Sequence, residues 1–218
     1  MSGTIPINDF TTVSIKNNTP TATSLSLSGK RQSKQLAAQY WSLDCQYTNL
    51  NRTEAAQVMA FLNKQNNSFN DFDVVLPQYS KPNGTIKYIA GGMANTNVIT
   101  CSNTAAIGDT IVYCAANHMR AANITANGYS ATTAFKAGDF VRFSTGNKTY
   151  QLTADSALTA TGTISFNIFP GLYTATTSAS TVEYWDVRFH VFNTEQSQEY
   201  RMTVGDTTDI SLKLLEAI

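Results

Sequence analysis

The chain has 218 residues, of which 14% are charged, and its 15 basic and 15 acidic residues give a formal net charge of zero. This length suffices for one large β domain or two small ones, with a core that needs no metal or disulfide. A nucleic-acid surface needs a clustered basic excess, and the small cluster of Lys30, Arg31 and Lys34 does not predict one.

The sequence carries no signal for a membrane or for export. No run approaches the roughly 18 apolar residues of a membrane-spanning helix, and the first ten residues lack a basic start followed by an apolar segment. We expect that the protein is synthesised in a cytosol-like compartment and does not insert into a membrane. Three cysteines make a disulfide framework unexpected, so they are read as buried thiols, although Cys101 and Cys114 can face each other across a hairpin.

The clearest change of hydrophobic period lies in the first third of the chain. Residues 36–47 alternate between polar and apolar side chains, which predicts a half-buried strand. Apolar residues then recur at three- and four-residue steps, which predicts an amphipathic helix at about 53–66, with Thr53 as its cap and Asn66-Asn67 as left-handed terminators. A strand follows at 69–76.

The first 33 residues alternate more weakly. They predict two short strands, 11–16 and 23–28, followed by a basic loop at Lys30-Arg31. Because one helix cannot bury every strand face, we expect residues 1–80 to form a small sheet with the helix packed across one face or end. This would be an N-terminal β domain and a candidate for ring formation.

A shift to Ser, Pro, Asn and Gly after residue 78, with a turn at Pro82-Asn83-Gly84, predicts the domain boundary. Residues 81–218 are then expected to form an all-β domain of sandwich or barrel type, so the fold class is mainly β with one helix in the N-terminal half. The expected strands are 97–101, 109–115, 140–144, 149–153, 162–168, 181–191, 199–204 and 208–214.

A Gly-Asp pair recurs at the start of strands, at Gly108-Asp109, Gly138-Asp139 and Gly205-Asp206. Glycine permits a positive φ and aspartate binds nearby backbone N–H groups, so local turn chemistry explains the recurrence without a repeat unit.

The sequence contains few of the residue patterns that predict a catalytic or metal site. His118 and His190 lack metal-ligand spacing, and no nucleophile elbow or phosphate-binding glycine loop occurs. Asp71, Asp73 and several turn aspartates offer paired acids for glycoside hydrolysis, but turn aspartates are commonly architectural. We therefore assign no catalytic, cofactor-binding or metal residue and expect no enzyme. The turn aspartates are Asp109, Asp139, Asp155, Asp206 and Asp209.

Aromatic residues allow a carbohydrate-binding or receptor-recognition module as an alternative, because aromatic rings stack on sugars. Aromatic residues at alternate strand positions are more often core residues. The candidates are Tyr40, Trp41, Tyr47, Tyr184 and Trp185.

Two stretches resemble a family of tailed-bacteriophage tail structural proteins, the distal-tail or tail-tip-like proteins. In that family a Trp-containing strand leads into a helix with an Ala-rich start and a Phe-Leu end, followed by a Phe-containing strand that closes in Pro. A second match is a Gly-Asp strand followed by a strand that ends in Pro-x-Leu, and the C-terminal strand is similar too. The matching residues are Trp41, Leu43, Leu50, Glu54, Ala55, Ala56, Phe61, Leu62, Phe69, Leu76 and Pro77, then 135–143, 149–153, 162–172 and 214–218.

The resemblance departs after the helix, where relatives have a glycine pair and this chain has residues 65–68, and it is weak over 84–134. It implies a virion protein assembled in the host cytoplasm, without a cofactor, that forms a ring or collar at the distal tail, within a baseplate hub or tail tip. The implied partners are further copies of the chain in a three- or six-fold ring, the tail tube, hub or tape-measure-associated proteins, and tail fibres. Nucleic acid is not among them.

Overall fold

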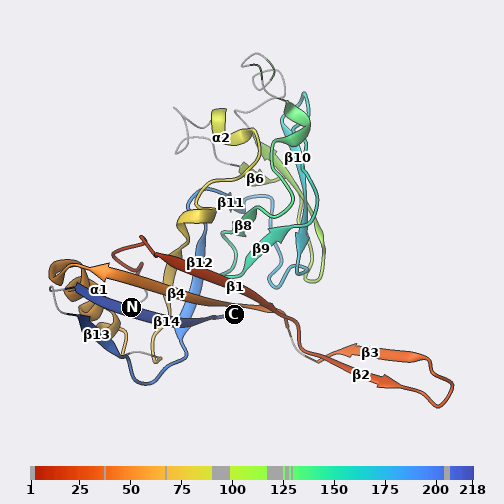
Figure 1. Cartoon of the computed structure of the whole chain (residues 1–218). Coiled ribbons are helices and arrows are strands. Elements are labelled where there is room, and N and C mark those ends of the chain that lie inside the picture. Colours follow the sequence, from red (N-terminus) through yellow and green to blue (C-terminus); the bar gives the residue numbers. More distant parts are fainter. Residues whose placement is uncertain are drawn as a thin grey trace. The chain divides into compact units, whose positions relative to one another are not determined.

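The computed structural model describes residues 3–36, 38–66, 68–89, 99–116, 125, 128, 130–203 and 207–218. The mainly β class is confirmed, and the chain divides into two units. Unit 1 contains residues 1–73 and 191–218, and unit 2 contains residues 74–190. In the described part of the chain the largest sheet has the strand order β1-β4-β14-β12-β5, with β13 paired to β14 (Figure 1). These strands are β1 (Thr12–Asn18), β4 (Tyr40–Leu50), β14 (Thr207–Glu216), β12 (Arg188–Asn193), β5 (Phe72–Val75) and β13 (Tyr200–Thr203).

The predicted central strand and helix are both present. They are β4 (Tyr40–Leu50) and α1 (Arg52–Lys64), and a short strand, β5 (Phe72–Val75), follows. Trp41, Leu43, Cys45 and Tyr47 of β4 are buried while the residues between them are more exposed, as the alternation predicted.

The N-cap of the helix lies two residues before the expected one. Asn51, and not Thr53, is the N-cap, because Asn51 and Glu54 form a reciprocal capping box across the first turn. At the other end Asn66 adopts the expected left-handed conformation with φ of 52°, whereas Asn67 lies outside the described residues. The apolar stripe of Ala55, Val58 and Leu62 is buried, and the helix packs on β4 and β14.

The N-terminal strands differ from expectation in one respect. Strands β1 (Thr12–Asn18) and β2 (Thr21–Leu25) occupy the predicted regions. Of the expected basic loop, Lys30 lies in the turn, whereas Arg31 is the first residue of β3 (Arg31–Gln35). Strands β2 and β3 form a separate two-stranded sheet, in register from Thr21 with Gln35 to Leu25 with Arg31.

The C-terminal strands return to unit 1. The expected division placed all of 81–218 in one domain, whereas β14 (Thr207–Glu216) pairs along β4 and residues 191–218 belong with the N-terminal sheet. Strand β13 (Tyr200–Thr203) pairs with β14, and the expected strand 181–191 is divided into β11 (Thr181–Glu183) and β12 (Arg188–Asn193). A positive φ of 49° at Asp186 marks the break between them.

Unit 2 is a closed barrel with the strand order β10-β7-β6-β11-β8-β9. The remaining bounds are β6 (Ile99–Cys101), β7 (Ile111–Ala116), β8 (Phe140–Phe143), β9 (Thr149–Leu152) and β10 (Thr163–Phe169), with short helical turns η1 (Pro77–Tyr79), α2 (Ile86–Ile89) and η3 (Ala131–Thr133). Phe135 lies in the core, with edge-to-face contacts to Phe166 and Tyr184 at 5.1 and 5.4 Å between ring centroids.

Two Gly-Asp turns in the barrel have matching hydrogen bonds. In each, the aspartate carboxylate accepts from the backbone N–H three residues before it, and the glycine has a positive φ. The N–H of Gly108 donates to Leu172 and that of Gly138 donates to Leu152, both at 2.8 Å. These contacts confirm local turn chemistry at both positions, while Gly205-Asp206 lies outside the described residues.

Candidate functional site

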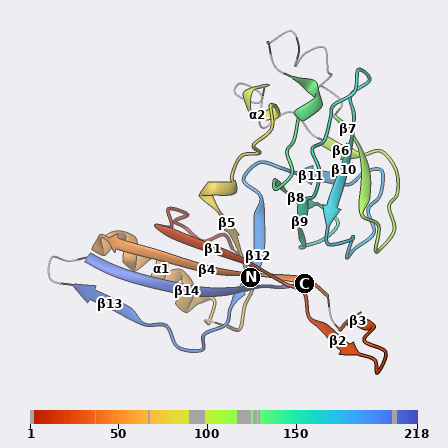
Figure 2. The ribbon, with the colours of Figure 1, turned by 45° about the vertical axis from the view of Figure 1, so that its right-hand side comes forward.

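The most exposed part of unit 1 is the β2–β3 hairpin, which extends beyond the ends of β1 and β4 (Figures 1 and 2). Every residue of both strands is exposed. We call residues 21–36 the arm. The tip is closed by a hydrogen bond from the N–H of Ser26 to Lys30 at 3.0 Å, and Gly29 takes the positive φ of 76° that the turn requires.

The arm combines apolar and basic side chains without a core of its own. Leu25, Leu27 and Leu36 are 75%, 111% and 65% exposed. Residues 21–36 include three basic side chains and no acidic one. A hairpin of two strands is marginal on its own in water, so an arm of this composition is typical of a segment that packs against a partner.

The strand that leads into the arm is an edge of the main sheet. In the described part of the chain β1 pairs only with β4, so its other side presents backbone N–H and C=O groups. The opposite edge differs, because Thr4 forms a parallel bridge with Asp73 and the N–H of Ile5 donates to Asp73 at 3.1 Å. The β1 edge and the arm are therefore consecutive exposed elements.

The sheet face opposite α1 is polar and carries two ion pairs. Lys16 on β1 contacts Asp44 on β4 at 2.6 Å, and Lys213 on β14 contacts Glu195 at 2.7 Å. The hydrogen bond and charge of Glu195 raise the pKa of Lys213. The two lysine side chains are largely exposed and the two acidic side chains are about one-third exposed, so the pairs give the surface a pattern of charge and add little stability.

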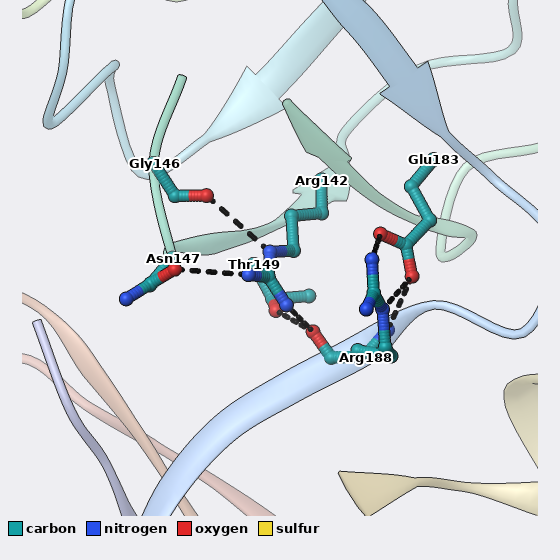
Figure 3. Close-up of polar contacts among 6 residues, drawn as sticks. All are labelled: Arg142, Gly146, Asn147, Thr149, Glu183 and Arg188. Carbon is teal, nitrogen blue, oxygen red and sulfur yellow. Dashed lines mark hydrogen bonds and ion pairs between the residues drawn. The ribbon is translucent and has the colours of Figure 1, made fainter. Parts of the chain in front are cut away.

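Unit 2 contains a polar hollow of about 420 Å³ beside β8 and β11. There the guanidinium of Arg188 contacts both carboxylate oxygens of Glu183, at 2.8 and 2.9 Å (Figure 3). Arg142 donates to the carbonyl of Gly146 at 3.3 Å and to Oδ1 of Asn147 at 2.9 Å. These contacts hold the β8–β9 turn and brace β11, which is a structural use of both arginines.

The predicted turn carboxylates are engaged with backbone groups. Asp139 accepts from the N–H groups of Asn83 and Lys136, at 2.8 and 2.9 Å, and Asp155 accepts from that of Ala137 at 2.9 Å. Asp209 accepts from the N–H of Asn49 at 2.9 Å. These aspartates are architectural, as expected, while Asp206 lies outside the described residues.

One of the two histidines, His190, lies within the described residues. His190 is half-buried on β12, and His118 lies outside the described residues. Among the described residues, no group of three or more His, Cys, Asp or Glu side chains is placed to hold a metal ion, and no helix is long and apolar enough to cross a membrane.

Most of the aromatic residues considered for sugar stacking belong to the cores. Trp41 and Tyr47 are buried residues of β4, and Tyr184 is buried in the barrel. Tyr40 and Trp185 are half-buried, and Trp185 packs under the ammonium of Lys81 at 5.4 Å. The aromatic residues on which the carbohydrate-binding alternative was based therefore do not form an exposed stacking surface.

Sequence reasoning missed the arm as a functional element. Its second strand carries the sequence RQSKQ, which has no apolar alternation because neither face of the hairpin is covered. The signal that was present is the pair of exposed leucines in an otherwise polar stretch, together with a tip that contains Gly29.

Residues 4–79 match a family described as distal tail protein pb9, A domain, N-terminal. The matched segment contains β1, the arm, β4, α1 and β5, and it is similar to a phage tail protein family, which confirms the resemblance over this range. The second resemblance, over residues 135–172, stays a prediction. No curated protein matches the chain.

Proposed function

We propose that this chain is a structural protein of a bacteriophage tail that forms a ring at the distal end and connects the tube or hub to fibres. The observation that carries the proposal is the match of residues 4–79 to a distal tail protein domain, a segment that also contains the exposed arm and the β1 edge. This segment supplies surfaces for assembly, namely the arm and the β1 edge.

A second copy of the chain is the partner that best fits the arm. The whole chain has net charge zero, so the three basic residues of the arm leave the remainder with 12 basic against 15 acidic residues. The arm therefore carries a charge opposite in sign to the net charge of the rest of an identical neighbour. The leucines add apolar area that the monomer leaves in water.

The geometry favours a head-to-tail contact. The arm projects from one end of the sheet and is covered by nothing on its own unit, so reciprocal use of one patch is not required. Head-to-tail contacts repeated around an axis close into a ring when the rotation fits. The β1 edge can extend the contact through backbone hydrogen bonds, and a stable contact needs about 1,000 Å² or more of buried area. Three- and six-fold rings are the expected forms.

Arm variants test this directly. Light scattering of the wild-type chain over a range of concentration is expected to give a closed multiple of 23.7 kDa. The double variant Leu25→Asp and Leu27→Asp is expected to give a folded monomer, because neither leucine is buried in unit 1.

The matched control is Ile107→Asp. Ile107 is also apolar and is 70% exposed, but it lies in the barrel, so this variant should assemble as the wild type does. Assembly that persists in the arm variant would contradict the arm as the contact. A wild-type chain that stays monomeric at high concentration and in the presence of purified tails would contradict the ring.

A further inference from the structure

Two of the three cysteines lie directly opposite each other inside the barrel. Cys101 of β6 and Cys114 of β7 are partners in the antiparallel register, their sulfur atoms are 3.9 Å apart, and both side chains are buried. Both are free thiols in this structure.

The backbone around the pair has the geometry that a cross-strand bridge needs. The N–H of Cys101 donates to Ser180 on its other side, at 2.8 Å, while the next pair along is joined by the N–H of Ser102 donating to Tyr113, also at 2.8 Å. Cys101 and Cys114 therefore form a non-hydrogen-bonded pair, in which the Cα atoms of an antiparallel ladder approach to about 4.5 Å. That separation falls within the range of disulfides, about 4.4–6.8 Å.

We propose that Cys101 and Cys114 are a redox-modifiable pair that peroxide oxidises to a disulfide, joining β6 to β7 within the barrel. The inference is independent of the proposed tail function.

The two thiols are unequal, which assigns their roles. The hydrogen bond from the thiol of Cys114 lowers the pKa of Cys101, against the opposing effect of burial. The pKa of Cys114 is raised because it is the donor to Cys101 and is buried. We expect Cys101, whose sulfur accepts the hydrogen bond from Cys114, to be the attacking thiolate and Cys114 to be the resolving thiol.

The chemistry balances with hydrogen peroxide as the oxidant. The Cys101 thiolate attacks one peroxide oxygen, the O–O bond breaks, and hydroxide leaves, which gives a sulfenic acid. Cys114 loses its proton to hydroxide and attacks the Cys101 sulfur, the S–O bond breaks and a second hydroxide leaves. The two thiol protons end on two water molecules. A small oxidant is required because both sulfur atoms are buried.

Cys45 provides an internal control. It is equally buried, on β4 of unit 1, but the residues opposite it are Val13 and Leu212, so it has no cysteine as a cross-strand partner. Burial, together with the charge of Asp44, raises the pKa of Cys45 to about 12, which leaves it a poor nucleophile.

The experiment treats the native full chain with hydrogen peroxide, removes the peroxide, unfolds the protein and alkylates the remaining thiols. Untreated protein should take up three alkyl groups, one for each cysteine, and treated protein should take up one, at Cys45. Peptide mapping should find a peptide pair joined through Cys101 and Cys114. The bridge closes a short loop, so the Tm of the barrel should rise by about 5–10 °C.

Variants separate the roles of the three thiols. Cys45→Ala should leave bridge formation unchanged, and Cys114→Ser should stop at a sulfenic acid on Cys101 that dimedone labels. A bridge that contains Cys45, three alkylated thiols after treatment, or a sulfenic acid on Cys114 in the Cys101→Ser variant at the same rate would each overturn the proposal.

Discussion

Substituting Gly84 with alanine should disrupt the barrel at one defined contact. A Cβ at this position would lie 1.9 Å from the carbonyl oxygen of Ala134 and 2.6 Å from the Cα of Phe135. Both neighbours are backbone atoms, so no side-chain rotation relieves the overlap, and the segment after Gly84 must move away from residues 133–135.

The cost follows from what that movement breaks. The N–H of Thr85 donates to Thr133 at 3.0 Å and that of Ile86 donates to Ala134 at 3.2 Å. Losing two backbone hydrogen bonds costs about 1–3 kcal/mol, and exposure of the fully buried Ile86 side chain costs up to about 1.5–3 kcal/mol. We expect Gly84→Ala to lower the free energy of unfolding of the barrel by about 3–5 kcal/mol.

Urea unfolding of fluorotryptophan-labelled protein, followed by ¹⁹F NMR, measures the effect for each unit, because Trp41 lies in unit 1 and Trp185 in unit 2. The control is Gly29→Ala, where a Cβ meets nothing within 4 Å and only the positive φ of 76° is strained, at about 1 kcal/mol. An unchanged Trp185 transition in Gly84→Ala would refute the packing of residues 84–86 on 133–135.

Three further predictions concern unit 1. Leu62→Ala should lower its free energy of unfolding by about 2–5 kcal/mol, since Leu62 is fully buried against the sheet, and a change below 1 kcal/mol in urea unfolding would contradict that burial. Asn51→Ala should cost about 1 kcal/mol through loss of the capping box, seen as faster amide exchange in the first helical turn, whereas the same exchange rates would place the cap elsewhere. The raised pKa of Cys45 contributes stability that is complete below the unfolded pKa of about 9 and is lost as pH rises towards about 12, by about 1.4 kcal/mol per pH unit. The free energy of unfolding, measured with denaturant from pH 8 to 11, should therefore fall more steeply with pH in the wild type than in Cys45→Ala. Parallel curves for the two proteins would contradict this contribution of Cys45.

Local periodicity predicted the elements well where one face of an element is buried. Strand β4 and helix α1 each carry a repeating apolar pattern, and both were found within a few residues of their expected positions. The cap was misassigned to Thr53 although the Asn51–Glu54 spacing is itself a capping-box signal. Strand β3 was missed because it has no buried face and therefore no period to detect.

Long-range pairing is the part that local patterns do not contain. The expected boundary near residue 80 is close to the observed passage into unit 2 after Asp73. The pairing of β14 with β4 joins segments about 170 residues apart, and nothing in the local sequence of either strand selects that partner. Facing of Cys101 and Cys114 was predictable because a single hairpin joins them.

The position of the protein in the virion tests the central claim most directly. Antibodies raised against the purified chain, carried on gold particles and imaged on intact virions by electron microscopy, report that position. We expect label confined to the distal end of the tail, at the junction with the fibres. Label along the tail tube or on the head, or virions that contain none of the chain, would contradict it.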